Sequence, residues 1–128
     1  MDAPLKRHLS SSYDEVLRRL PDALKSEGFG VLTEIDLAQT LKNKLGVDFR
    51  RYKILGACNP TLAHGALSVS LDVGVLLPCN VVVYEGDDGR AVVQTIDPMQ
   101  TIAASDPRLA EVAATVRTKL VRVLEQLS

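Results

Sequence analysis

Two short runs rich in branched apolar residues, 80–85 and 90–96, are separated by the tetrapeptide GDDG at 86–89. Glycine and aspartate are typical of tight hairpin turns, because both tolerate the backbone angles that such turns require. The pattern predicts two antiparallel strands joined by a hairpin. The chain is thereby limited to folds whose sheet is at least partly antiparallel.

Helix and strand patterns continue on both sides of this hairpin. A capping box that begins at Ser12 predicts a helix over 13–27, which Pro21 is expected to kink or restart. Asp106 followed by Pro107 predicts the start of a long amphipathic C-terminal helix of about 20 residues. The remaining expected elements are a weak strand at 6–9, strands at 29–36 and 51–58, a short helix from 37 that ends at Gly46, and a small helix at 61–70.

Helices on both sides of a run of strands predict a two-layer α+β domain, with helices packed on one face of a mainly antiparallel sheet of four to five strands. The expected order is β-α-β4-α, with two short inserted helices. A chain of 128 residues suits one ordinary core, so we expect 1–128 to form a single domain. We expect the strands to form a meander, because 71–78 is long enough to reverse the path of the helix at 61–70.

Composition excludes some classes of partner. A formal net charge of −1, only 4% aromatic residues and no tryptophan predict no nucleic-acid binding. No stretch approaches the roughly 18 unbroken apolar residues of a membrane span, so we expect no membrane partner. Residues 1–12 lack the apolar centre of a secretory signal. The expected location is therefore the cytoplasm, with reduced thiols.

The dipeptide Cys-Asn occurs twice, at 58–59 and 79–80, once at the end of a predicted strand and once at the start of another. In a meander the end of one strand lies beside the start of the next, so both dipeptides would reach the same edge of the sheet. A parallel crossover would place them at opposite edges. The candidate pocket is bordered by Cys58, Asn59, Cys79, Asn80 and the loop Val75-Leu76-Leu77.

Two neighbouring thiols can form a disulfide or hold a soft ion such as Cu(I). Zinc prefers four ligands, for which His64, Asp36 and Asp97 are the available additions. Cysteines also fill cores as small apolar residues, and asparagines at strand ends also bond their own backbone in turns. The sequence leaves these interpretations open.

No reaction is indicated by the remaining motifs. The cysteines lack the C-x-x-C spacing of thioredoxin-like proteins, and no Ser-His-Asp set is present. The glycines at 28–30 precede a strand and those at 86–89 flank two acids, so neither segment resembles a phosphate cradle. The catalytic residues and any cofactor therefore stay unassigned.

Three ordered blocks, GFGVLTEID at 28–36, YKILGACNP at 52–60 and LLPCNVVVYE at 76–85, resemble the family called domain of unknown function 302. The resemblance extends from about Ser12 to the last helix. It implies a compact α+β domain and a homodimer. It implies no reaction, so no catalytic role is transferred to any residue.

Three hypotheses for function follow. The leading one is a small cytoplasmic binding or accessory module that holds a small molecule, a sulfur species or a soft metal at the Cys-Asn pocket. The second is a thiol-based enzyme in which Cys79 or Cys58 attacks the substrate. The third is a structural module that forms homodimers through a sheet edge or the apolar loop at 73–77.

Overall fold

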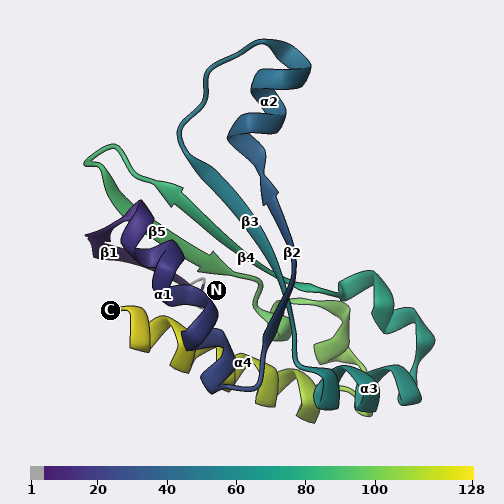
Figure 1. The fold of residues 1–128 in the computed structure, drawn as a ribbon. Helices are drawn as coiled ribbons and strands as arrows, with labels where there is room; N and C mark the ends of the chain where they lie inside the picture. Colours follow the sequence, from purple (N-terminus) through teal and green to yellow (C-terminus); the bar gives the residue numbers. More distant parts are fainter. Residues whose placement is uncertain (1–4) are drawn as a thin grey trace.

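Five strands form one antiparallel sheet at the centre of the fold (Figure 1). The computed structural model describes residues 5–128, apart from the side chain of Ile102. The strands are β1 (Lys6–Ser12), β2 (Gly30–Asp36), β3 (Tyr52–Cys58), β4 (Cys79–Glu85) and β5 (Arg90–Thr95). They lie side by side in the order β1-β5-β4-β3-β2. The predicted meander is confirmed, since β3, β4 and β5 are antiparallel neighbours in chain order.

The two longest helices, α1 (Tyr13–Ser26) and α4 (Ala110–Leu127), lie against each other on one face of this sheet (Figure 1). The shorter helices and 3₁₀ turns are inserted between strands or precede α4. The predicted two-layer α+β architecture is therefore confirmed. The inserted elements are α2 (Leu37–Leu45), α3 (Pro60–Val69), η1 (Leu71–Leu76), η2 (Pro98–Gln100) and η3 (Ile102–Ser105).

The main core lies between the sheet and these two long helices. Leu20 of α1, Leu120 of α4 and Val81 of β4 are completely buried there. Burial of each such side chain stabilises the fold by about 1.5–3 kcal/mol. Residues on the opposite face of β3 and β4, such as Ile54 and Val82, are only half-buried. The helix layer thus covers one face of the sheet and leaves the other partly open.

Some elements differ from their predicted form. Strand β1 continues to Ser12, and α1 runs through Pro21 without a break, with the proline on its exposed side. Helix α4 begins at Ala110, later than predicted, because Asp106 first accepts backbone hydrogen bonds from Leu109 and Ala110 at 2.9 and 3.0 Å. The expected apolar loop at 73–78 forms most of η1.

Two sequence-based expectations involve the start of the chain. The predicted domain of 1–128 and the segment 1–12, taken to lack a secretory signal, both include residues 1–4, which lie outside the described part. Within residues 5–128, no helix combines the length and apolar character needed to cross a lipid bilayer.

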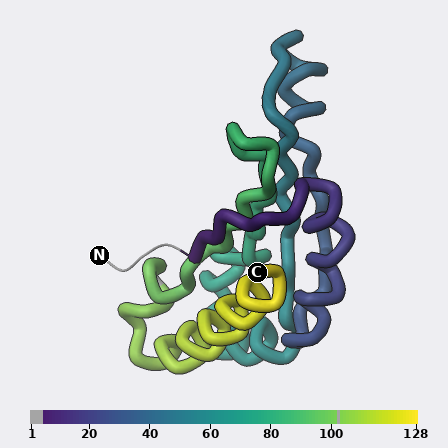
Figure 2. The backbone as a smooth tube through the Cα atoms, turned by 90° about the vertical axis from the view of Figure 1, so that its left-hand side faces the viewer, coloured from purple at the N-terminus to yellow at the C-terminus, as the bar shows by residue number. Residues whose placement is uncertain are grey.

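Residues 34–52, the ends of β2 and β3 with α2 between them, project from the body of the domain and are called the arm (Figures 1 and 2). Asp36 caps α2 by accepting a hydrogen bond from the Gln39 backbone at 3.0 Å, and Gly46 ends it with φ of 67°. None of the residues of α2 is buried, and every residue of β2 is exposed. The arm therefore has little core of its own.

Candidate functional site

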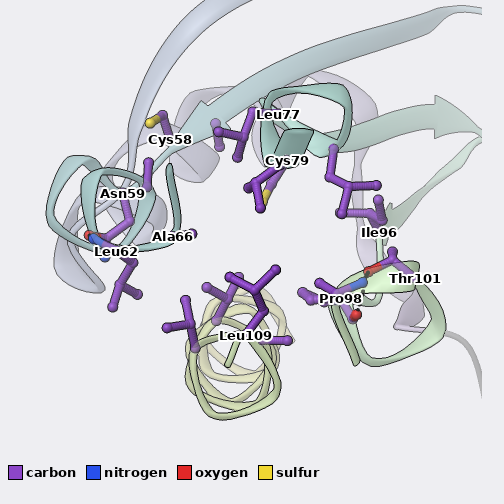
Figure 3. A pocket seen from close by; sticks show the side chains of 18 of the residues that line it. Cys58, Asn59, Leu62, Ala66, Leu77, Cys79, Ile96, Pro98, Thr101 and Leu109 are labelled. Carbon is purple, nitrogen blue, oxygen red and sulfur yellow. Dashed lines mark hydrogen bonds between the residues drawn. The ribbon is translucent and has the colours of Figure 1, made fainter. Parts of the chain in front are cut away.

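An apolar cavity of about 80 Å³ lies where β3 ends and β4 begins, between the sheet, α3 and the start of α4 (Figure 3). A site for one water molecule needs only about 10–15 Å³ by the same kind of measure. Almost all of the surface is hydrocarbon, so a water inside would find few hydrogen-bond partners. The side chains around it include Ala57, Leu62, Ala66, Leu77, Cys79, Ile96, Leu109, Val112 and Ala113.

Cys79 contributes a sulfur atom to the cavity wall. It is the cross-strand partner of Ala57, whose side chain is fully buried on the helix-covered face, and Figure 3 shows the Cys79 sulfur directed into the cavity. Burial, and secondarily the nearby Cys58, raises the pKa of Cys79 to about 11. The thiol is therefore protonated at neutral pH and acts as a small apolar group.

Cys58 follows Ala57 directly in β3. Successive side chains of a strand point to opposite faces of the sheet, so Cys58 points away from the face that carries Cys79. Figure 3 agrees: the Cys58 sulfur is directed away from the cavity. The two thiols lie at the same end of neighbouring strands, both are free, and they are directed to opposite sides.

Asn59 borders the cavity but is already hydrogen-bonded within the protein. Its side-chain oxygen caps α3 by accepting from the Leu62 backbone at 3.2 Å, and its amide donates to the Glu27 carbonyl at 3.3 Å. A Cβ at Gly28 would lie 2.9 Å from that amide nitrogen, and Gly28 has φ of +85°. Asn59 thus joins the start of α3 to the end of α1.

Asn80 and Val75 do not line the cavity. Asn80 pairs with Gly56 on the other face of the sheet and is exposed. Val75 is 85% exposed in η1, whereas its neighbours Leu76 and Leu77 both contribute to the wall. The structure therefore places Cys58, Asn59 and Cys79 beside one cavity and places Asn80 elsewhere.

The additional zinc ligands considered from the sequence are also dispersed. His64 is exposed on α3, and Asp36 lies in the arm. Asp97 is nearly buried, accepts from the Met99 backbone at 2.9 Å and pairs with Arg117 of α4 at 3.2 Å. Within the part of the chain that the structure describes, no three His, Cys, Asp or Glu side chains are grouped to hold a metal ion.

Several wall residues had no specific signal in the sequence, although Val73 belongs to the apolar segment 73–77 considered above. Ala66, Val73 and Leu109 form a second small core and line the cavity from α3, η1 and the turn before α4. Their apolar character is ordinary for helices, and only the packing of three distant segments identifies them as neighbours. Thr101 also lines the cavity, from the turn between η2 and η3.

These features define a class: a two-layer α+β domain with one helix-covered sheet face and an apolar cavity at the β3–β4 end of the sheet. The model of the family described as "Domain of unknown function DUF302" matches residues 5–127, so the chain belongs to this family. The crystal structure of an uncharacterised conserved DUF302 protein from Bacillus stearothermophilus is similar, with 34% sequence identity and a TM-score of 0.86 over 96% of each chain. No curated protein matches the sequence significantly.

Proposed function

We propose that this domain is a small binding module that takes up a small apolar molecule, or the end of an alkyl chain, in the cavity beside Cys79. The observation that carries the proposal is a space of about 80 Å³ with an almost entirely hydrocarbon lining. Each methylene group moved from water into such a space contributes about 0.8 kcal/mol. An occupant of a few carbon atoms would thus bind weakly but specifically.

The neutral thiol of Cys79 favours an apolar occupant over the other candidates from the sequence. A metal site or a nucleophile needs the thiolate, whereas burial raises the pKa of Cys79 to about 11. A shared soft ion would also need Cys58 on the same side. A sulfur-containing molecule is compatible with the cavity, provided that its sulfur is uncharged. The free thiols support the cytoplasm, a reducing compartment, as the proposed location.

Two neighbouring alanines of α4 provide a direct test. Ala113 is buried and lines the cavity, whereas Ala114 is exposed. Benzene would be titrated into wild-type protein, Ala113→Leu and Ala114→Leu, with binding followed by NMR and folding by circular dichroism. We expect wild type and Ala114→Leu to bind, and folded Ala113→Leu to have lost binding. Equal binding by both variants, or none by wild type, would contradict the proposal.

A second candidate function, homodimerisation, is favoured by the open face of the sheet. Tyr52 and Tyr84 stack there with ring centroids 5.3 Å apart, beside the half-buried Ile54 and Val82. Ile35, their neighbour on β2, is 46% exposed. Apolar surface of this kind is typical of protein interfaces. A second copy, covering this face and the arm, would bury what the monomer leaves exposed.

Light scattering can distinguish this open sheet face from the apolar segment at 73–77, which the sequence analysis considered as an interface. Ile35→Lys places a charge on the open sheet face, and Val75→Lys places one on the exposed apolar segment before β4. We expect wild type and Val75→Lys to be dimers and Ile35→Lys to be a monomer. A monomeric wild type at micromolar concentration would eliminate this candidate. A monomeric Val75→Lys together with a dimeric Ile35→Lys would show that the interface lies at 73–77 instead.

A further inference from the structure

Two groups in the wall of the apolar cavity differ in chemistry from the aliphatic side chains around them. Much of the wall consists of methyl groups, such as those of Ala57 in β3, Ala66 in α3 and Ala113 in α4. Methyl groups contact aromatic and saturated molecules alike through dispersion. The two different groups are the Phe29 ring and the Cys79 sulfur. They can therefore decide which kind of apolar molecule is preferred.

The polar side chains at the cavity are already bonded to the protein's own backbone. The Thr101 hydroxyl donates to the Pro98 carbonyl at 2.7 Å and accepts from the Ala103 backbone at 3.3 Å. Asn59 caps α3 and donates to the end of α1. A ligand group that needs hydrogen bonds would lose its bonds to water and gain little in return. The enclosed part of a ligand should therefore be uncharged and free of hydroxyl or amine groups.

The Cys79 thiol is not used in this way. Its sulfur is directed into the cavity (Figure 3), and within residues 5–128 it forms no hydrogen bond. Its raised pKa of about 11 keeps the thiol protonated at neutral pH. A protonated thiol offers a polarisable sulfur and a weak S–H donor, and sulfur makes favourable contacts with aromatic rings. A saturated ring gains no such contact.

Phe29 adds an aromatic contact from the segment between α1 and β2. Its side chain is 2% exposed and belongs both to the main core and to the cavity wall. Its backbone is held by a hydrogen bond to the Leu24 carbonyl at 3.0 Å, so the ring is presented from a fixed position. Aromatic pairs attract each other more than burial of their area alone explains. Phe29 and Cys79 thus favour the same kind of ligand.

We propose that the apolar cavity favours an uncharged aromatic ring over a saturated ring of the same size, and that Cys79 determines this preference. The inference rests on the proposed function, because it names the class of molecule that the cavity would take up. The ring would lie against the Cys79 sulfur, with methyl groups and the Phe29 ring forming the other walls. It can be the end of a larger molecule whose remaining part stays outside.

Benzene and cyclopentane, which have nearly the same molecular volume, test the preference. Titrations of wild type, Cys79→Ala and Cys79→Val, followed by NMR, give the ratio of the benzene and cyclopentane association constants in each folded protein. Loss of the contact between sulfur and ring should lower this ratio about twofold to tenfold in both variants. Alanine is smaller than cysteine and valine is larger. A change caused by cavity size alone would therefore have opposite signs in the two variants.

Cys58→Ala is the matched control, because this thiol lies at the same end of the sheet but is directed away from the cavity. Its ratio should equal that of wild type. Unchanged ratios in both Cys79 variants, opposite changes in them, or an equal fall in Cys58→Ala would overturn the inference and leave the proposed function standing. Binding of neither probe by wild type would overturn the proposed function itself, and this inference with it.

Discussion

Ala57 and Cys79 are direct partners across the β3–β4 ladder, and both face the helix layer. Cys58 therefore lies diagonally next to Cys79 in the sheet but is directed to the other face. Adjacent backbone positions are not sufficient to bring two sulfur atoms together. The register of this strand pair directs the two thiols to opposite faces of the sheet.

The first prediction concerns oxidation of these two cysteines. A disulfide needs Cβ atoms about 3.5–4.5 Å apart with their bonds directed toward each other, which opposite faces of a sheet do not provide. Mild oxidation with diamide should therefore leave the intact protein without an internal Cys58–Cys79 bridge. Mass spectrometry of the unreduced monomer provides the measurement. A peptide that links the two cysteines, recovered from folded protein, would show that the pairing is wrong.

Because Cys79 is buried, the free energy of unfolding should decrease as the pH rises into the alkaline range. Its folded pKa of about 11 lies above the ordinary value of 9.0, so the unfolded chain loses this proton first as pH rises. The thiol thus favours the folded state fully below pH 9, and this contribution is lost progressively between about 9 and 11. The loss can reach about 3 kcal/mol, since about two pH decades separate the two pKa values and each is worth about 1.4 kcal/mol.

Urea unfolding of wild type and Cys79→Ala at a series of pH values measures this loss. Other groups titrate equally in both proteins, so the difference between the two curves isolates Cys79. We expect the unfolding free energy of wild type to fall more steeply above pH 9 than that of the variant. Parallel curves would mean that the thiol is solvated in the folded state.

Gly56 should tolerate no side chain. A Cβ built there would lie 2.3 Å from the Thr33 hydroxyl oxygen and 2.7 Å from a ring carbon of Pro78. Gly56→Ala should therefore destabilise the domain by about 1–3 kcal/mol, the usual cost of overpacking. Gly65→Ala is the control, because its Cβ meets nothing within 4 Å on α3, and alanine should stabilise that helix by up to about 1 kcal/mol. Thermal melts that rank the variants in the opposite order would refute the close packing at Gly56.

The ion pair between Asp97 and Arg117 should contribute to holding α4 in place. Asp97 is 9% exposed, and its second oxygen caps η2. Arg117→Leu removes a partner from a nearly buried carboxylate and should cost about 1–3 kcal/mol. Arg108→Leu breaks an exposed pair with Asp106 and should have a smaller effect. Urea midpoints of the two variants provide the comparison. Equal midpoints would show that the pair of Asp97 and Arg117 stabilises the fold no more than the exposed pair of Asp106 and Arg108.

Much of this fold could be predicted from local patterns. The turn at 86–89, the cap at Ser12 and the left-handed Gly46 each determine the backbone within a few residues, and each occurs where the sequence indicates. The order of β2 to β5 followed from the meander, which the length of 71–78 favoured, whereas the position of β1 beside β5 was not predicted. The alternation of side chains along β3 could also be predicted. Whether Cys58 and Cys79 point to the same face of the sheet depended on the register between β3 and β4.

Only the side of the cavity at the end of β3 and the start of β4 could be predicted, because the other walls come from segments that meet only after folding. Ala66, Val73 and Leu109 are separated widely in the chain and have ordinary apolar character. The role of Arg117 could not be predicted from the sequence either, because its partner Asp97 lies in a turn 20 residues earlier in the chain. Asn59 was expected either to bind a ligand or to bond its own backbone in a turn, and in the structure its side-chain oxygen caps α3.

Xenon diffusion into crystals of this domain tests the apolar cavity most directly, because xenon enters dry cavities without needing a polar contact. Our account predicts xenon density beside the Cys79 sulfur, between Leu62 and Leu109, in wild type and in Ala114→Leu, and no density there in Ala113→Leu. An empty or water-filled space in wild-type crystals under xenon pressure would contradict it.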